Sequence, residues 1–200
     1  EVADTAILVV TFNSDIPASG RLCFVGQDLR KSGRIAASLM NKLAKPEDHI
    51  LVAAGNLEFS GHHQRTEGFM NCWKELGNHE QNCTIIQTYN ESSVTFDKVA
   101  AALDDAKLTG VYMANENVSG CADAVKRYAK RPIRIIAHDL SAENSKLLKA
   151  QRLDFIISQN MYLQGYRPVE ILTHLLTDPT TPVDEFKHTR IEIVTEENLV

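Results

Sequence analysis

The chain has 200 residues, of which 44% are hydrophobic and 24% are charged, and its formal net charge is −5. This composition is ordinary for a globular protein and excludes a disordered chain. An acidic chain without a basic run is by itself a poor binder of DNA or of anionic membranes. No apolar stretch approaches the ~20 residues that span a bilayer, and the apolar run at 6–10 is too short for a signal sequence.

The cysteines lie far apart in the sequence, and no two of them form a Cys-x-x-Cys pair. This spacing argues against a zinc ribbon and against a thioredoxin-type site. A secreted disulfide scaffold is the less favoured alternative, because a chain of this size can form a core without disulfide bonds. We expect reduced, buried thiols in a cytoplasmic protein, at Cys23, Cys72, Cys83 and Cys121.

The first elements alternate between strand and helix. Residues 6–12 form a continuous apolar run, which predicts a strand buried on both faces with a neighbour on each side. A second short run at 22–25 predicts another strand. Asp28 is the predicted cap of a helix over 28–43, which ends before Pro46 because proline cannot continue a helix.

The same alternation continues along the rest of the chain. Further strands are predicted at 49–54, 84–88, 110–113, 133–137, 155–158 and 190–194. Further helices are predicted at 60–76, 94–106, 118–129, 141–151 and 162–176, the fourth of these capped by Ser141. Strands separated by helices indicate βαβ units, and therefore an α/β fold whose parallel sheets carry helices on both faces.

Polar side chains follow the predicted strands. In parallel sheets ligands bind at the carboxyl ends of the strands, so these positions are the candidate site. A sugar hydroxyl both donates and accepts a hydrogen bond, which suits amides, carboxylates and guanidinium groups. The residues are Asn13, Ser14, His63, Gln64, Arg65, Tyr89, Asn90, Asn115, Glu116, His138, Asp139, Gln159 and Asn160.

Each of these residues also has a purely structural explanation. Asp139 and Asn115 could cap the helices that follow them, and Arg65 could be a solvated surface charge. Gln159 could satisfy loop backbone groups, and His138 is either a hydrogen-bonding group of the pocket or a packed side chain. Their recurrence at equivalent points of the repeat favours a binding site.

Several segments resemble a known family. The motifs lie, in order, at 24–28, 32–37, 64–69, 111–116, 133–139 and 156–159. Together they resemble the LacI/GalR repressors and the type I periplasmic sugar-binding proteins, over nearly the whole chain. The resemblance implies a two-lobed fold of the type I periplasmic-binding-protein kind, with parallel sheets flanked by helices.

The resemblance also implies a division into lobes. Residues 1–26 and 160–187 would form part of an N-terminal lobe, and 27–159 with 188–200 the C-terminal lobe. The first lobe would be incomplete, with its first strand–helix units and any DNA-binding headpiece preceding Glu1. Hinges are expected near residues 26–27, 159–160 and 188–189.

Carried over by position, the family's ligand contacts predict a site between the lobes. The predicted ligand-binding residues are Asn13, Ser14, Arg65, Tyr89, Asn115, Asp139 and Gln159. Asn13 stands where many relatives have Asp, and the aromatic contact falls on Tyr89 or Asn90 because the alignment there is loose by one residue. His138 replaces an aromatic residue common among relatives.

Enzyme chemistry has no sequence signature here. The chain lacks a phosphate-binding glycine loop and a Gly-x-Ser-x-Gly elbow. The neighbouring His62 and His63 point to different parts of a helix, so both are expected on the surface and not at a metal. We expect no catalytic residue, no metal and no cofactor.

The resemblance leads to a main interpretation and two alternatives. The chain would be the effector-binding and dimerisation core of a LacI-type transcription regulator, cytoplasmic, with a carbohydrate as ligand. It would form a homodimer and would not bind membranes. It would contact DNA only through a headpiece that this sequence does not include. The first alternative is a periplasmic solute-binding protein of a sugar transporter, and the second is an α/β enzyme.

Overall fold

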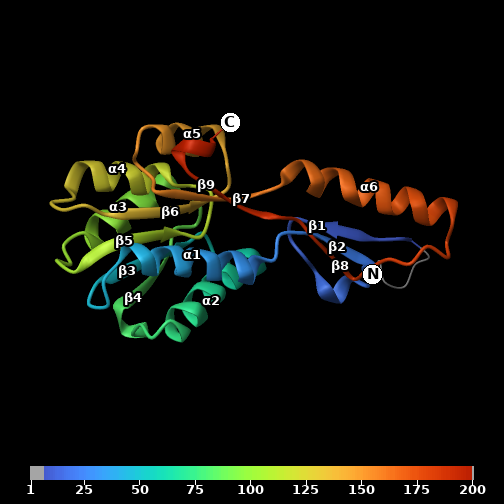
Figure 1. Cartoon of the computed structure of the whole chain (residues 1–200), viewed down its shortest axis with the longest axis horizontal. Helices are drawn as coiled ribbons and strands as arrows, with labels where there is room; N and C mark the ends of the chain where they lie inside the picture. Colours follow the sequence, from blue (N-terminus) through green and yellow to red (C-terminus); the bar gives the residue numbers. More distant parts are fainter. Residues whose placement is uncertain (1–6, 200) are drawn as a thin grey trace. The chain divides into compact units, whose positions relative to one another are not determined.

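The computed structural model describes residues 7–199. The chain divides into two units, each with its own sheet (Figure 1). Unit 1 consists of Glu1–Asp28 and Gln159–Ile191, and unit 2 of Leu29–Ser158 and Glu192–Val200. Unit 1 extends past residue 187 because a strand at 186–188 pairs within its sheet.

Unit 2 is built on a six-stranded sheet with the order β4-β3-β5-β6-β7-β9. The pairs β3–β4, β3–β5, β5–β6 and β6–β7 are parallel. The strands are β3 (His49–Ala54), β4 (Cys83–Gln87), β5 (Leu108–Met113), β6 (Arg134–His138), β7 (Phe155–Gln159) and β9 (Ile191–Val194). The carboxyl ends of β3, β4, β5, β6 and β7 therefore meet at one edge of the sheet, as the βαβ pattern predicts.

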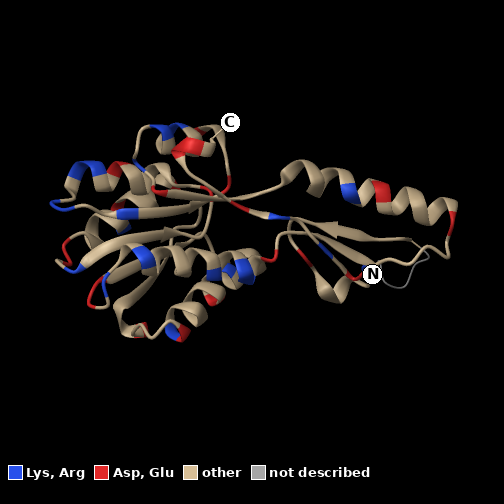
Figure 2. Ribbon diagram, in the orientation of Figure 1, with Lys and Arg blue, Asp and Glu red and all other residues tan. Residues whose placement is uncertain are grey.

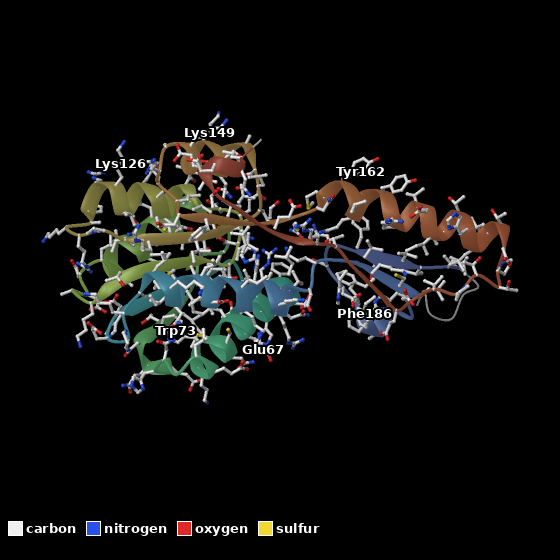
Figure 3. The ribbon with its side chains drawn as sticks, viewed as in Figure 1. Glu67, Trp73, Lys126, Lys149, Tyr162 and Phe186 are labelled. Carbon is white, nitrogen blue, oxygen red and sulfur yellow. The ribbon has the colours of Figure 1, made fainter. Side chains whose placement is uncertain are left out.

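Helices cover both faces of this sheet (Figure 1). Two of them, α1 (Leu29–Leu43) and α2 (Ser60–Glu75), pack together on one face. The other face packs against α3 (Ser92–Ala102), α4 (Ser119–Tyr128) and α5 (Ala142–Lys149). Figure 3 shows Trp73 on α2, where its side chain is almost fully buried. Two faces of apolar packing make this a doubly covered α/β sheet.

Unit 1 contains a three-stranded parallel sheet with the order β1-β2-β8. Its strands are β1 (Val10–Phe12), β2 (Cys23–Gly26) and β8 (Phe186–His188), and α6 (Met161–Thr177) packs against β1 and β2. Short 3-10 helices are η1 (Pro17–Ser19), η2 (Glu80–Asn82) and η3 (Glu196–Asn198).

The strand predicted at residues 6–12 is shorter in the structure. The strand spans only Val10–Phe12, Ala6 lies outside the described residues, and β1 is an edge strand of the described sheet. Its residues are half-buried or exposed, with Phe12 at 55%. An apolar run indicates a strand, but the number of its neighbours depends on chain segments far away in sequence. Sequence analysis also missed β8, because its three residues are all exposed and carry no apolar run.

Candidate functional site

A pocket of about 580 Å³ lies in unit 2 at the carboxyl ends of the sheet strands. Its walls come from α2 and from the loops that follow β4, β5 and β6. The lining residues are His62, Arg65, Asn90, Ser92, Asn115, Glu116, Asn117, Ser119, Asp139, Ser141 and Glu143. Every one of them carries a polar or charged side chain, so the pocket has no aliphatic wall.

Arg65 and Asp139 lie beside each other in the wall of this pocket. Arg65 Nη1 lies 3.5 Å from Asp139 Oδ2 and donates to the Ala114 carbonyl oxygen at 3.2 Å. The Arg65 side chain is 6% exposed and that of Asp139 is 23% exposed. The buried Nε of Arg65 has no hydrogen-bond partner among residues 7–199. Burial beside a carboxylate holds the guanidinium at the pocket wall. Arg65 is therefore not a solvated surface charge.

Asn115 connects two of the loops. Its Nδ2 donates to Thr88 Oγ1 at 3.2 Å and to Asn90 Oδ1 at 2.9 Å, and the residue is 1% exposed. Asn117 Nδ2 donates to the Asn90 carbonyl oxygen at 2.6 Å. The chain after β4 is therefore held to the chain after β5 by side-chain amides, which orients the polar groups toward the pocket.

Left-handed backbone recurs around the site. The φ angles are 58° at Asn90, 53° at Tyr89 and 67° at Asp139. Non-glycine residues adopt this region rarely, and Asn and Asp adopt it more readily than bulky residues. Such conformations concentrate at functional sites, where the surrounding structure maintains them.

Asn144 holds the loop after β6, and sequence analysis assigned it no part in the site. Its Nδ2 donates to the carbonyl oxygens of Glu116 at 3.1 Å, His138 at 3.1 Å and Asp139 at 2.9 Å. The predicted cap is present as well, because Ser141 Oγ accepts from the Asn144 backbone nitrogen at 3.2 Å. Asn144 thus couples the loops after β5 and β6, and only long-range contacts reveal it.

His138 is a packed side chain. It is 0% exposed, and its Nε2 lies 2.7 Å from the Tyr112 hydroxyl. Burial, together with the positive charge of Arg65, holds the pKa of His138 well below 6.5. Burial also raises the pKa of Tyr112. The Tyr112 hydroxyl therefore donates to a neutral imidazole beneath the pocket.

The two neighbouring histidines differ, which corrects one expectation. His63 is exposed as predicted, but His62 is half-buried and lines the pocket. The His62 Nδ1 accepts from the Asn56 backbone nitrogen at 3.0 Å. Burial lowers the pKa of His62 below 6.5. A helix places successive residues about 100° apart, so only one of the pair faces the pocket.

The remaining predicted residues lie elsewhere. Tyr89 is 55% exposed, and the centre of its ring lies 5.6 Å from Lys98 Nζ. Tyr89 does not line the pocket, whereas its neighbour Asn90 does. Asn13, Ser14 and Gln159 belong to unit 1. Gln159 Oε1 accepts from Gln164 Nε2 at 2.9 Å, and the Asn13 backbone nitrogen donates to Val25. The structure thus brings together Arg65, Asn115 and Asp139 from the predicted set.

Two other kinds of site are absent from the described part of the chain. Residues 7–199 contain no cluster of three or more His, Cys, Asp or Glu arranged to hold a metal ion. No helix within that range is long and apolar enough to cross a membrane.

Residues 1–179 match the periplasmic binding protein domain. The chain belongs to this family. No curated protein matches it in sequence. The predicted α/β fold of the type I periplasmic-binding-protein kind is thereby confirmed, and the pocket occupies the strand ends of a periplasmic binding protein domain.

Solved structures share the fold. A glucose-galactose binding protein from Geobacillus stearothermophilus is similar with a TM-score of 0.84 and 20% identity, over 96% of this chain and 69% of its own. An ABC transporter solute binding protein from Agrobacterium vitis with bound D-fucose has a TM-score of 0.83 and 23% identity, over 96% and 67%. An ABC transporter solute binding protein from Burkholderia graminis, in complex with D-arabinose, has a TM-score of 0.85 and 20% identity. The match covers 96% of this chain and 68% of that protein.

Proposed function

We propose that this periplasmic binding protein domain binds a monosaccharide through the pocket of unit 2 and serves as the solute-binding component of a sugar transporter. The observation that carries the proposal is the lining of that pocket, which combines the Arg65–Asp139 pair with buried Asn115 and no aliphatic side chain. The function is therefore binding, and the pocket residues act by recognition.

The lining suits vicinal hydroxyl groups. The Asp139 carboxylate accepts hydrogen bonds and the Arg65 guanidinium donates them. The Asn115 Oδ1, which has no partner among the described residues, can accept a further bond, and the Asn90 Nδ2 can donate one. Charge-assisted bonds of this kind are about twice as strong as neutral ones. The sugars named for the structural relatives, D-fucose and D-arabinose, support the same ligand class.

A transcription regulator is the second candidate. The relatives described above are transporter or sugar-binding proteins, which favours the solute-binding role. One observation favours the regulator, because all four cysteines are free, as in reducing compartments. The homodimer, the DNA contact through a headpiece and the cytoplasmic location belong to this second candidate.

The ligand is tested by calorimetric titration of the chain with D-glucose, D-galactose, D-fucose, D-arabinose and D-ribose. We expect saturable binding of at least one sugar, and loss of that binding in Arg65→Ala. The Arg34→Ala variant removes another Arg–carboxylate pair, with Glu75, and should bind normally. Failure of every sugar to bind the folded chain would overturn the proposal.

The two candidates are separated in the native organism. Cell fractionation should place a transporter component outside the cytoplasmic membrane, whereas a regulator stays in the cytoplasm and crosslinks to DNA. Cytoplasmic protein that crosslinks to specific DNA would reject the transporter role and leave sugar binding intact.

A further inference from the structure

A second pocket, of about 530 Å³, lies within unit 1. One wall is a face of α6 that includes Leu163, Arg167, Ile171 and His174, at helical spacing. The opposite wall comes from β2, β8 and the residues after β8, and the segment 181–183 closes one side. Its volume falls in the range of small-molecule sites, about 300–1,000 Å³.

The strand wall consists of Val25 of β2 and the successive residues 186–190. Val25 pairs with Lys187 in the parallel ladder, and the Thr189 backbone nitrogen continues it by donating to the Gly26 carbonyl oxygen at 2.8 Å. Side chains two residues apart point to the same face of a strand, so Lys187 and Thr189 lie on one side. Thr189 is 8% exposed, and its Oγ1 has no hydrogen-bond partner among the described residues.

The chemistry of this pocket differs from that of the first. Apolar side chains form much of its lining, namely Val25, Leu163, Ile171, Pro182, Val183 and Phe186. The charged side chains are Arg167, Lys187 and Arg190, against the single acid Glu170. A positive excess in a chain whose net charge is −5 is a local feature that composition does not explain.

Not all of these cations are already paired. Arg167 pairs with Glu170, and Lys187 with Asp184. Arg190 makes no hydrogen bond or ion pair with any other residue of the described range. Figure 2 shows basic residues both on α6 and on the strand segment beside it. The lining of this pocket therefore includes an unpaired guanidinium together with apolar side chains.

We infer that this pocket of unit 1 binds a small organic anion, a carboxylate with an apolar body. The carboxylate accepts hydrogen bonds from Arg190, and the apolar body lies against Leu163, Ile171 and Val183. A guanidinium binds a carboxylate with two parallel hydrogen bonds, which a neutral ligand cannot replace. The aliphatic part of the wall leaves hydroxyl groups that face it without partners, so a ligand with an apolar body suits this pocket better than a sugar does.

Octanoate is the probe, and 1-octanol is its neutral counterpart. In calorimetric titrations of the full chain we expect octanoate to bind about tenfold or more tightly than 1-octanol. Arg190→Gln should remove that difference and leave 1-octanol binding unchanged. Added salt should weaken the binding of octanoate only. Lys149→Gln is the matched control, since Lys149 points away from the surface of α5 in unit 2 and should change nothing (Figure 3).

A second variant keeps the test decisive. Ile171→Trp fills the pocket and should abolish binding of both probes, with circular dichroism as the check on folding. Absence of octanoate binding, equal binding of the two probes, or unchanged octanoate binding in Arg190→Gln would each overturn the inference. Sugar titrations of Arg190→Gln should match those of the unmodified chain, so this result is independent of the proposed sugar site.

Discussion

Arg65 illustrates how one side chain can combine structural and binding roles. Its guanidinium donates to the Ala114 carbonyl oxygen and lies beside Asp139, while its Nε remains without a partner in the described structure. A buried donor without a partner costs stability, and a ligand oxygen can remove that cost. Arg65 and Asp139 were predicted from their positions after predicted strands and from the family resemblance, and the structure shows that they share one pocket.

Removing either partner should therefore weaken sugar binding. We expect Arg65→Ala or Asp139→Ala to lower the binding free energy by about 2–4 kcal/mol, because a charge-assisted bond is lost and the remaining charge is left buried. Calorimetric titration measures the affinity and thermal unfolding measures the stability. Normal affinity together with a large loss of stability would mean that these residues act only in the structure.

The lowered pKa of His138 leads to a prediction of how the free energy of unfolding depends on pH. Its pKa is held well below 6.5 in the folded state, so the unfolded chain binds more protons at mildly acidic pH. The free energy of unfolding should therefore be greatest above about pH 6.5 and fall as the pH drops below it, by up to about 1.4 kcal/mol per pH unit for each such histidine. His62, whose pKa is also lowered, contributes in the same direction.

The variant that isolates this effect is His138→Gln. Its amide can still accept the Tyr112 hydroxyl but does not titrate. Urea unfolding of both proteins across mildly acidic to neutral pH should show a shallower pH dependence for the variant. Identical slopes would mean that the pKa of His138 is the same in the folded and the unfolded protein.

At the scale of elements, the contact between α1 and α2 positions the site. A Cβ added to Gly33 would lie 2.0 Å from the Arg65 carbonyl oxygen, and one added to Gly68 would lie 2.1 Å from the Arg30 carbonyl oxygen. Both distances are shorter than any contact between non-bonded atoms. The two helices can approach this closely only because glycine has no side chain, and α2 carries Arg65.

Gly33→Ala should consequently affect both folding and binding. We expect a loss of about 1–3 kcal/mol in the free energy of unfolding, since one helix must move away from the other, and weaker sugar binding because Arg65 moves with α2. Gly165→Ala in α6 is the matched control. No heavy atom lies within 4 Å of a Cβ there, so the change should be neutral or stabilising by up to about 1 kcal/mol. Equal effects of the two substitutions in urea unfolding would contradict this account.

At the scale of the whole molecule, the two units differ in how much apolar surface they bury. Among the described residues, the buried apolar side chains of unit 1 are Cys23, Phe24, Val25, Pro168 and Leu175. Unit 2 holds the rest of the buried core, on both faces of its sheet. Because apolar burial is the main stabilising contribution to folding, the units should have unequal stability.

Hydrogen exchange can measure this difference directly. We expect the amides of β2 to exchange faster than those of β3 and β5, since local opening of unit 1 costs less free energy. A ligand of the unit 1 pocket, such as octanoate, should slow exchange in β2. Equal protection of these strands without ligand would indicate that the two units unfold as one.

The sequence by itself determined the succession of elements and the residues at the strand ends. The strand His49–Ala54 and the Ser141 cap agree with expectation. Both depend on local properties of the chain, namely the spacing of apolar residues and a side chain that can cap a helix. Arg65, Asn115 and Asp139 were among the polar residues that follow the predicted strands, and the family resemblance then selected them as ligand contacts.

Only the tertiary structure decided which neighbours each residue has. It placed Asn90 and not Tyr89 in the pocket lining, and it buried His138 against Tyr112. It also revealed how Asn144 binds the carbonyl oxygens of two loops. These outcomes depend on strand order, on left-handed turns and on contacts between residues distant in sequence, and local pattern encodes none of them directly.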